Sequence, residues 1–141
     1  MISVIAVGTD GSATAAEAVK VAAGMARRFD AKVVLLSALS PEGLAQDAGD
    51  SSDERQWAHN PAARTREILA RAEEDVRRDG VECRTLVAGG DPADVLVRLA
   101  AECGADVLVI GNKGMKRRVL GSVPNSVTHN APCSVFVVKT T

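Results

Sequence analysis

Two glycine-containing segments, far apart in the chain, have the residue types needed to hold a phosphorylated ligand. The first is Gly8-Thr9-Asp10, which follows an apolar run and contains an acid. The second starts with Gly111-Asn112-Lys113-Gly114, directly after the apolar run 107–110, and reaches Gly121-Ser122-Val123. Glycine lets the backbone approach a ligand closely, and a helix N-terminus offers free N–H groups and partial positive charge. The second segment therefore predicts a phosphate-binding loop, although the G-x4-G-K-[ST] spacing is absent.

Each candidate residue also has a structural interpretation. The carboxylate of Asp10 could accept a hydrogen bond from a ribose hydroxyl, or it could form an Asx turn that leads into a helix. The glycines could mark strand ends, but their grouping favours approach to a ligand. We expect Ser122 to cap a helix and to offer its hydroxyl and amide to a phosphate. Basic side chains that could neutralise a phosphate lie in the segment that starts at Gly111; they are Lys113, Lys116, Arg117 and Arg118.

Composition limits the classes of partner. The chain has 141 residues, of which 46% are hydrophobic and 25% charged, and its net charge is −1. This length suits a single domain spanning residues 1–141. The balanced charge and the scarcity of aromatic residues argue against nucleic acid and against an anionic membrane surface as partners. Without a leader or a long apolar run we expect a cytoplasmic protein, with Cys83, Cys103 and Cys133 as reduced core residues.

Apolar runs alternate with segments of helical periodicity along the chain, which predicts βαβ units and a mostly parallel sheet. The third strand alternates polar and apolar residues, as an edge strand does, so we expect a three-layer α/β sandwich with strand order 3-2-1-4-5. Either Ser12 or Thr14 could cap the first helix, whose inner face would carry Ala18, Ala22, Met25 and Phe29. The expected strands are residues 2–7, 33–38, 82–87, 107–110 and 135–138, and the later helices start at Asn60-Pro61, Asp91-Pro92 and Ser122.

The strand order brings the two glycine-containing segments together. In an open parallel sheet, ligands bind outside the carboxyl ends of the strands, at the point where the winding reverses. With order 3-2-1-4-5 the reversal lies between the first and fourth strands, which are the strands that lead into Gly8 and Gly111. The sequence thus predicts one ligand site built from both ends of the chain.

Over its whole length the chain resembles the universal stress protein family. The opening strand with its short acidic turn, residues 4–12, matches that family, and so does the segment Gly111-x2-Gly114 followed by Gly121-Ser122-Val123 and an apolar strand. The resemblance implies a flavodoxin-like, adenine nucleotide alpha hydrolase-like fold that binds an adenine nucleotide (ATP, AMP or cyclic AMP), with or without Mg. It implies a sensor or regulator that forms a homodimer through its last strand. It places backbone atoms of Ala38 against adenine, and the other implied contacts are Gly8, Thr9, Asp10, Gly111, Asn112, Gly114, Arg118, Gly121, Ser122 and Val123.

One departure from the family pattern keeps an alternative open. Six residues separate Gly114 from Gly121, where the pattern has nine. Three residues correspond to about 10 Å of extended chain, so the outer phosphates of a triphosphate would be less well covered. A nucleotide-free dimeric adaptor of the same family is therefore the second interpretation. Slow ATP hydrolysis is the third, and it lacks an evident general base.

Overall fold

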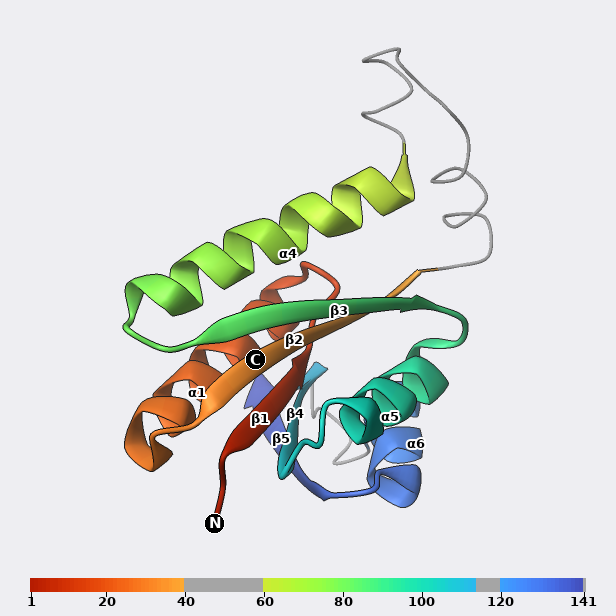
Figure 1. Cartoon of the computed structure of the whole chain (residues 1–141). Coiled ribbons are helices and arrows are strands. Elements are labelled where there is room, and N and C mark those ends of the chain that lie inside the picture. The colour runs from red at the N-terminus through yellow and green to blue at the C-terminus, as the bar shows by residue number, and fades with distance from the viewer. Residues whose placement is uncertain (40–59, 114–119, 141) are drawn as a thin grey trace.

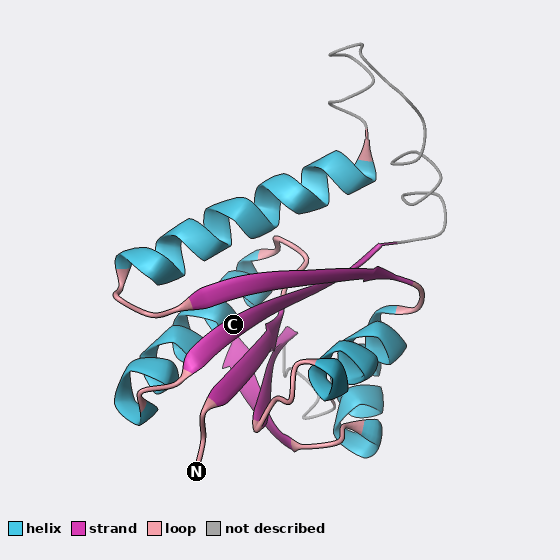
Figure 2. Cartoon of the chain, in the orientation of Figure 1, coloured by secondary structure: helices cyan, strands magenta, loops and turns pink. Residues whose placement is uncertain are grey.

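The fold is a five-stranded parallel sheet covered by helices on both faces (Figures 1 and 2). The structure is a computed structural model that describes residues 1–39, 60–113 and 120–140. The strand order is β3-β2-β1-β4-β5, which confirms the predicted topology. The strands are β1 (Val4–Gly8), β2 (Lys32–Leu39), β3 (Cys83–Gly89), β4 (Val107–Lys113) and β5 (Ser134–Thr140).

Within residues 1–39, 60–113 and 120–140, two helices cover each face of the sheet. Helices α1 (Ala13–Phe29) and α4 (Pro61–Arg78) lie on one face, and α5 (Pro92–Glu102) and α6 (Ser122–Asn130) lie on the other (Figure 1). Between these layers and the sheet lie two clusters of buried apolar side chains, one on each face. Leu35 and Leu36 illustrate the division, because they are adjacent in β2, fully buried, and members of opposite clusters. Burial of one such side chain contributes roughly 1.5–3 kcal/mol.

Local sequence sets where the helices start. The Ser12 hydroxyl accepts a hydrogen bond from the Ala15 N–H at 3.1 Å, so Ser12 rather than Thr14 caps α1. Asn60 and Asp91 cap α4 and α5 in the same way, and each is followed by the expected proline. Helix α6 differs from the prediction, because Gly121 is its N-cap, Ser122 is its first residue, and no side chain caps it.

Two further expectations are corrected, and one is confirmed. Phe29 is 48% exposed, whereas Ala18 and Ala22 are fully buried, because Phe29 is the last residue of α1. The segment 111–113, expected to be a loop, continues strand β4 because it pairs with Val138, Lys139 and Thr140 of β5. The three thiols are free as predicted, and burial raises the pKa of Cys83 to about 11.

At the amino-terminal ends of the strands, the carboxylate of Asp106 links β1 to β4. Oδ2 of Asp106 accepts hydrogen bonds from the backbone N–H groups of Ser3 and Val4, at 2.8 and 3.0 Å. These two bonds hold the pKa of Asp106 below its usual value. They join the segment that enters β1 to the residue that precedes β4, and these are the two strands between which the winding reverses.

Candidate functional site

The central strand of the sheet stops earlier than its two neighbours. Strand β1 ends at Gly8, which is paired with Leu36, while β2 continues to Leu39. On the other side, pairing between β1 and β4 ends at Val7 and Val109, while β4 continues to Lys113 along β5. The sheet therefore has a notch at its carboxyl edge, at the predicted reversal point. We call this feature the notch.

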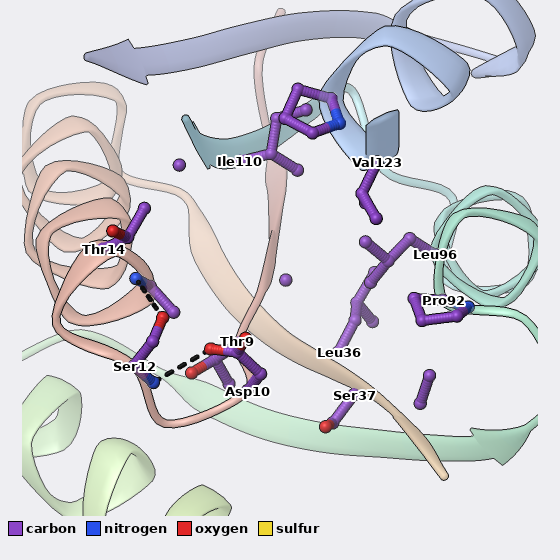
Figure 3. Close-up of a pocket in the computed structure, with 15 residues that line it drawn as sticks. Thr9, Asp10, Ser12, Thr14, Leu36, Ser37, Pro92, Leu96, Ile110 and Val123 are labelled. Carbon is purple, nitrogen blue, oxygen red and sulfur yellow. Dashed lines mark hydrogen bonds between the residues drawn. The ribbon is translucent and has the colours of Figure 1, made fainter. Parts of the chain in front are cut away.

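A cavity of about 270 Å³ fills the notch (Figure 3). Its floor is the end of β1, its two sides are the extended parts of β2 and β4, and the first turns of α1, α5 and α6 surround it. The side chains labelled in Figure 3 come from β2, β4, the three helices and the turn after β1, and Thr14 lies across the opening from Leu96 and Pro92. The lining residues are Gly8, Thr9, Asp10, Ser12, Thr14, Ala15, Leu36, Ser37, Ala38, Pro92, Leu96, Ile110, Gly111, Val123 and Pro124.

Buried polar side chains gather at this edge. Among the described residues, the buried polar or charged side chains are Thr9, Ser37 and Asn112, which lie at the carboxyl ends of β1, β2 and β4. Buried polar groups need hydrogen-bond partners, so their placement in an apolar core has an energetic cost. Asn112 meets this need in part by accepting the N–H of Gly121 at 3.0 Å.

Both interpretations of Asp10 are compatible with its geometry. Its Oδ1 accepts the N–H of Ser12 at 2.9 Å, which is the Asx turn (dashed in Figure 3). The side chain is exposed and also lines the cavity. An ionised carboxylate accepts several hydrogen bonds through its two oxygens. The turn therefore fixes the orientation of the carboxylate while leaving it able to accept a hydrogen bond from a ligand hydroxyl.

The backbone of Ala38 faces the notch. In a parallel strand, the N–H and C=O of one residue point to the same side, and successive residues alternate sides. The C=O of Leu36 accepts the N–H of Thr9, on the side of β1, while the C=O of Leu39 accepts the N–H of Gly90, on the side of β3. Ala38 therefore directs its N–H and C=O toward the side of β1, beyond the point where β1 has ended. The N–H donor and the C=O acceptor of Ala38 can pair with an acceptor and a donor on the edge of a heterocyclic base.

A larger hollow of about 930 Å³ continues from the cavity over the ends of β4 and β5, and we call it the outer hollow. The start of α6 forms one wall. Because the N–H of Gly121 is bonded to Asn112 and Pro124 has none, the first-turn amides of Ser122 and Val123 are the ones that α6 presents. Two free amides at the positive end of a helix suit a phosphate. The lining residues are Asp10, Ser12, Ala13, Thr14, Glu17, Gly111, Asn112, Gly121, Ser122, Val123, Pro124, Lys139 and Thr140.

The glycines of the site serve packing as well as access. A Cβ atom on Gly111 would lie 2.7 Å from Cγ2 of Thr14 and 2.8 Å from its carbonyl oxygen, so this glycine allows α1 to approach β4. A Cβ atom on Gly8 would lie 3.0 Å from Cδ2 of Leu96. At Gly121 a Cβ atom would lie 3.3 Å from Oδ1 of Asn112, a less severe contact, and Gly121 is also the N-cap of α6.

The structure brings nine of the eleven predicted site residues around the cavity and the outer hollow, and the other two, Gly114 and Arg118, lie outside the described residues. Sequence reasoning missed Leu36, Ser37, Pro92 and Leu96, which line the cavity. Ser37 precedes the predicted Ala38, so the strand-end rule could have found it. Pro92 and Leu96 follow the edge strand β3, and they reach the notch because α5 crosses back over β2. Sequence reasoning also did not identify three residues of the outer hollow, which are Glu17, Lys139 and Thr140.

Two kinds of feature are absent from the part of the chain that the structure describes. No three His, Cys, Asp or Glu side chains are grouped so that they could hold a metal ion. None of the described helices is long and apolar enough to cross a membrane.

Comparison with known proteins agrees with this geometry. The sequence model of the Universal stress protein family matches residues 1–139. The universal stress protein Rv1636 of Mycobacterium tuberculosis is 40% identical over 143 residues, covering 97% of this chain and 96% of that protein.

Two solved structures extend the comparison. A universal stress protein in complex with cAMP is 31% identical, with a TM-score of 0.78 and coverage of 99% of both chains. The universal stress protein of Archaeoglobus fulgidus in complex with dAMP is 27% identical, with a TM-score of 0.72 and coverage of 99% of this chain and 100% of that one. The chain belongs to the universal stress protein family, and its sheet has the flavodoxin-like arrangement of that family.

Proposed function

We propose that this protein binds an adenine nucleotide in the notch and acts as a cytoplasmic sensor or regulator whose state depends on that ligand. The observation that carries the proposal is the early end of β1, because it leaves the backbone N–H and C=O of Ala38 facing a cavity. Adenine would pair with these groups. The ribose would lie against Asp10, and the phosphate would bind the amides of Ser122 and Val123, with Mg as a counter-ion of the phosphates.

Related proteins support the ligand class. The two relatives described above, at 31% and 27% identity, were solved with cAMP and with dAMP, so adenine nucleotides with one phosphate fit this family's fold. A cavity of about 270 Å³ that continues into a wider hollow is compatible with a nucleoside in the inner part and a phosphate in the outer part.

The first experiment identifies what the protein carries. Mass spectrometry of the small molecules released on denaturing the purified protein should detect an adenine nucleotide, and calorimetric titration of the stripped protein with AMP and cAMP should show one site per chain. A protein that carries no nucleotide and shows no binding to either would favour the nucleotide-free adaptor instead.

A variant with a matched control tests the placement of the ribose. Asp10→Asn keeps an oxygen for the Asx turn but replaces the other carboxylate oxygen by an amide that donates instead of accepting. We expect its affinity for AMP to fall about 10- to 100-fold, as for a lost hydrogen bond to a charged group. Asp79→Asn makes the same change of charge at the C-terminal end of α4, outside both hollows, and should bind like the wild type. Equal affinities of the two variants would remove Asp10 from the site.

A further inference from the structure

The outer hollow has charged side chains that no phosphate-binding loop requires. Among the described residues that line it, the charged ones are Asp10, Glu17 and Lys139. Lys139 and Glu17 come from different elements that line the hollow, Lys139 from the edge strand β5 and Glu17 from helix α1. We propose that this pair determines how much phosphate charge the site accepts, and that it selects adenine nucleotides with a single phosphate group over triphosphates. The inference rests on the proposed nucleotide site.

Lys139 lies beside the start of α6. It is paired in register with Asn112 of β4, and paired residues of neighbouring strands point to the same face of a sheet. Asn112 reaches the N-cap of α6 through its bond to the N–H of Gly121, so Lys139 extends on the same face. It is an exposed residue that lines the hollow together with Ser122. Its ammonium group can thus approach a phosphate held by the amides of Ser122 and Val123.

Glu17 has the opposite effect. It follows Thr14 by three residues on α1, so the two share one face of the helix, and both line the hollow. Its nearest described cation is Lys20, with 4.0 Å between Nζ and Oε1, and these side chains are 78% and 57% exposed. Such an exposed pair is weak and leaves most of the negative charge effective. A second or third phosphate that extends past Ser122 would approach this carboxylate.

The described lining therefore provides one cation against two carboxylates. A single phosphate can be matched by Lys139 and the two amides of α6. Each additional phosphate adds charge that Glu17 and Asp10 repel, and repulsion acts over several ångströms at partly aqueous sites. The charges of the described lining therefore favour a nucleoside monophosphate or a cyclic monophosphate, whereas the side chains of Lys113, Lys116, Arg117 and Arg118 lie outside what the structure describes.

Removing the carboxylate tests the selection. Glu17→Gln and the wild type are titrated with AMP and with ATP in EDTA, and the ratio of the two affinities is compared. We expect the ratio to shift toward ATP by about fivefold, the size expected of one unit charge acting across several ångströms. Glu102→Gln is the control, because it removes the same charge from the last residue of α5, at the opposite edge of the sheet. A ratio that stays the same in Glu17→Gln, or changes equally in Glu102→Gln, would overturn the proposal for Glu17.

Substitution of Lys139 tests the part of the proposal that concerns the positive charge. Lys139→Gln should lower the affinity for AMP about fivefold while leaving that for adenosine, which has no phosphate, unchanged. Arg98→Gln, an exposed site on α5 outside both hollows, is the control for the loss of a positive charge. Equal losses for AMP and adenosine would mean that Lys139 acts on the fold instead of the phosphate, and no loss would remove it from the site.

The outcomes separate this inference from the proposed function. Wild-type protein that binds AMP, with affinity ratios unaffected by either variant, refutes the charge selection and leaves the nucleotide site standing. Wild-type protein that binds neither AMP nor adenosine refutes both.

Discussion

At Gly111 the backbone of β4 comes so close to helix α1 that no side chain fits. A Cβ atom there would meet both Cγ2 and the carbonyl oxygen of Thr14, at 2.7 and 2.8 Å. The carbonyl belongs to the first turn of α1 and cannot rotate away. A glycine that looks like a ligand-contact residue in the sequence is thus also required for packing, and its substitution tests both roles together.

Gly111→Ala should lower the free energy of unfolding by about 1–3 kcal/mol, because the methyl group overpacks the contact between α1 and β4. Urea denaturation followed by circular dichroism measures the change. Gly24→Ala is the control, since a Cβ atom at Gly24 meets nothing within 4 Å and alanine is the better helix former, by about 0.5–1 kcal/mol. A Gly111→Ala protein as stable as the wild type would show that α1 moves freely relative to β4.

Asp106 should make stability depend on pH in the acid range. Its pKa is lowered in the folded state by the N–H groups of Ser3 and Val4, so the stabilisation is fully present above the unfolded pKa, about 3.9. It is lost as pH falls through the folded value. In urea titrations from pH 6 to pH 2, Asp106→Asn should lose less stability on acidification than the wild type. Parallel curves for the two proteins would contradict this role of Asp106.

At the scale of elements, the site depends on strands of unequal length. Strands β4 and β5 support each other past the end of β1, and the Thr140 hydroxyl ties their ends by donating to the C=O of Asn112 at 3.1 Å. The same hydroxyl lies 3.3 Å from that of Thr14 in α1. Strand β5 therefore supports the outer hollow, although it is the edge strand of the sheet.

That exposed edge leads to a prediction about assembly. An apolar edge strand can pair with another chain, and the simplest closed arrangement is a two-fold dimer with antiparallel β5 strands. Phe136 is 45% exposed on β5, whereas Val137 packs with the apolar cluster under α5 and α6. Phe136→Lys should therefore weaken a dimer with little effect on the fold, while Val137→Lys should disturb both. Sedimentation velocity at micromolar concentration measures this, and a monomeric wild type would refute the dimer.

At the scale of the whole molecule, the two ends of the sequence build one site. The end of β1 with the turn into α1 lines the same cavity as the end of β4 and the start of α6, with β2 and α5 completing it. A ligand bound there contacts elements from both halves of the sheet. It therefore stabilises the folded chain as a unit, by about 2.7 kcal/mol at a concentration 100 times its dissociation constant.

The short segment between Gly114 and Gly121 predicts weak discrimination among nucleotides. With three residues fewer than the family pattern, coverage of the outer phosphates should be limited. We expect AMP, cyclic AMP or ADP to bind about as well as ATP, within roughly tenfold, so the charge selection by Glu17 and Lys139 acts inside that range. Competition titration against a fluorescent adenine nucleotide measures the order. A strong preference for ATP would contradict both this expectation and the charge selection by Glu17.

The sequence by itself determined the elements and their order. Apolar runs of four to six residues and the capping residues Asn60 and Asp91 are local signals, and the polarity of β3 marks it as an edge strand, so the predicted topology is confirmed. The approximate place of the site followed as well, because the strand order alone sets where the winding reverses.

Only the tertiary structure decided where each strand stops and which helix reaches the site. The length of β4 depends on its partner β5, which lies about 27 residues later in the chain, and no local signal reports that pairing. The choice between Ser12 and Thr14 as the cap depends on the turn made by Asp10. Leu96 enters the cavity because α5 packs back over β2, and Glu17 and Lys139 line one hollow because α1 begins and β5 ends at the same edge of the sheet. Such contacts are long-range packing effects, and composition and periodicity do not encode them individually.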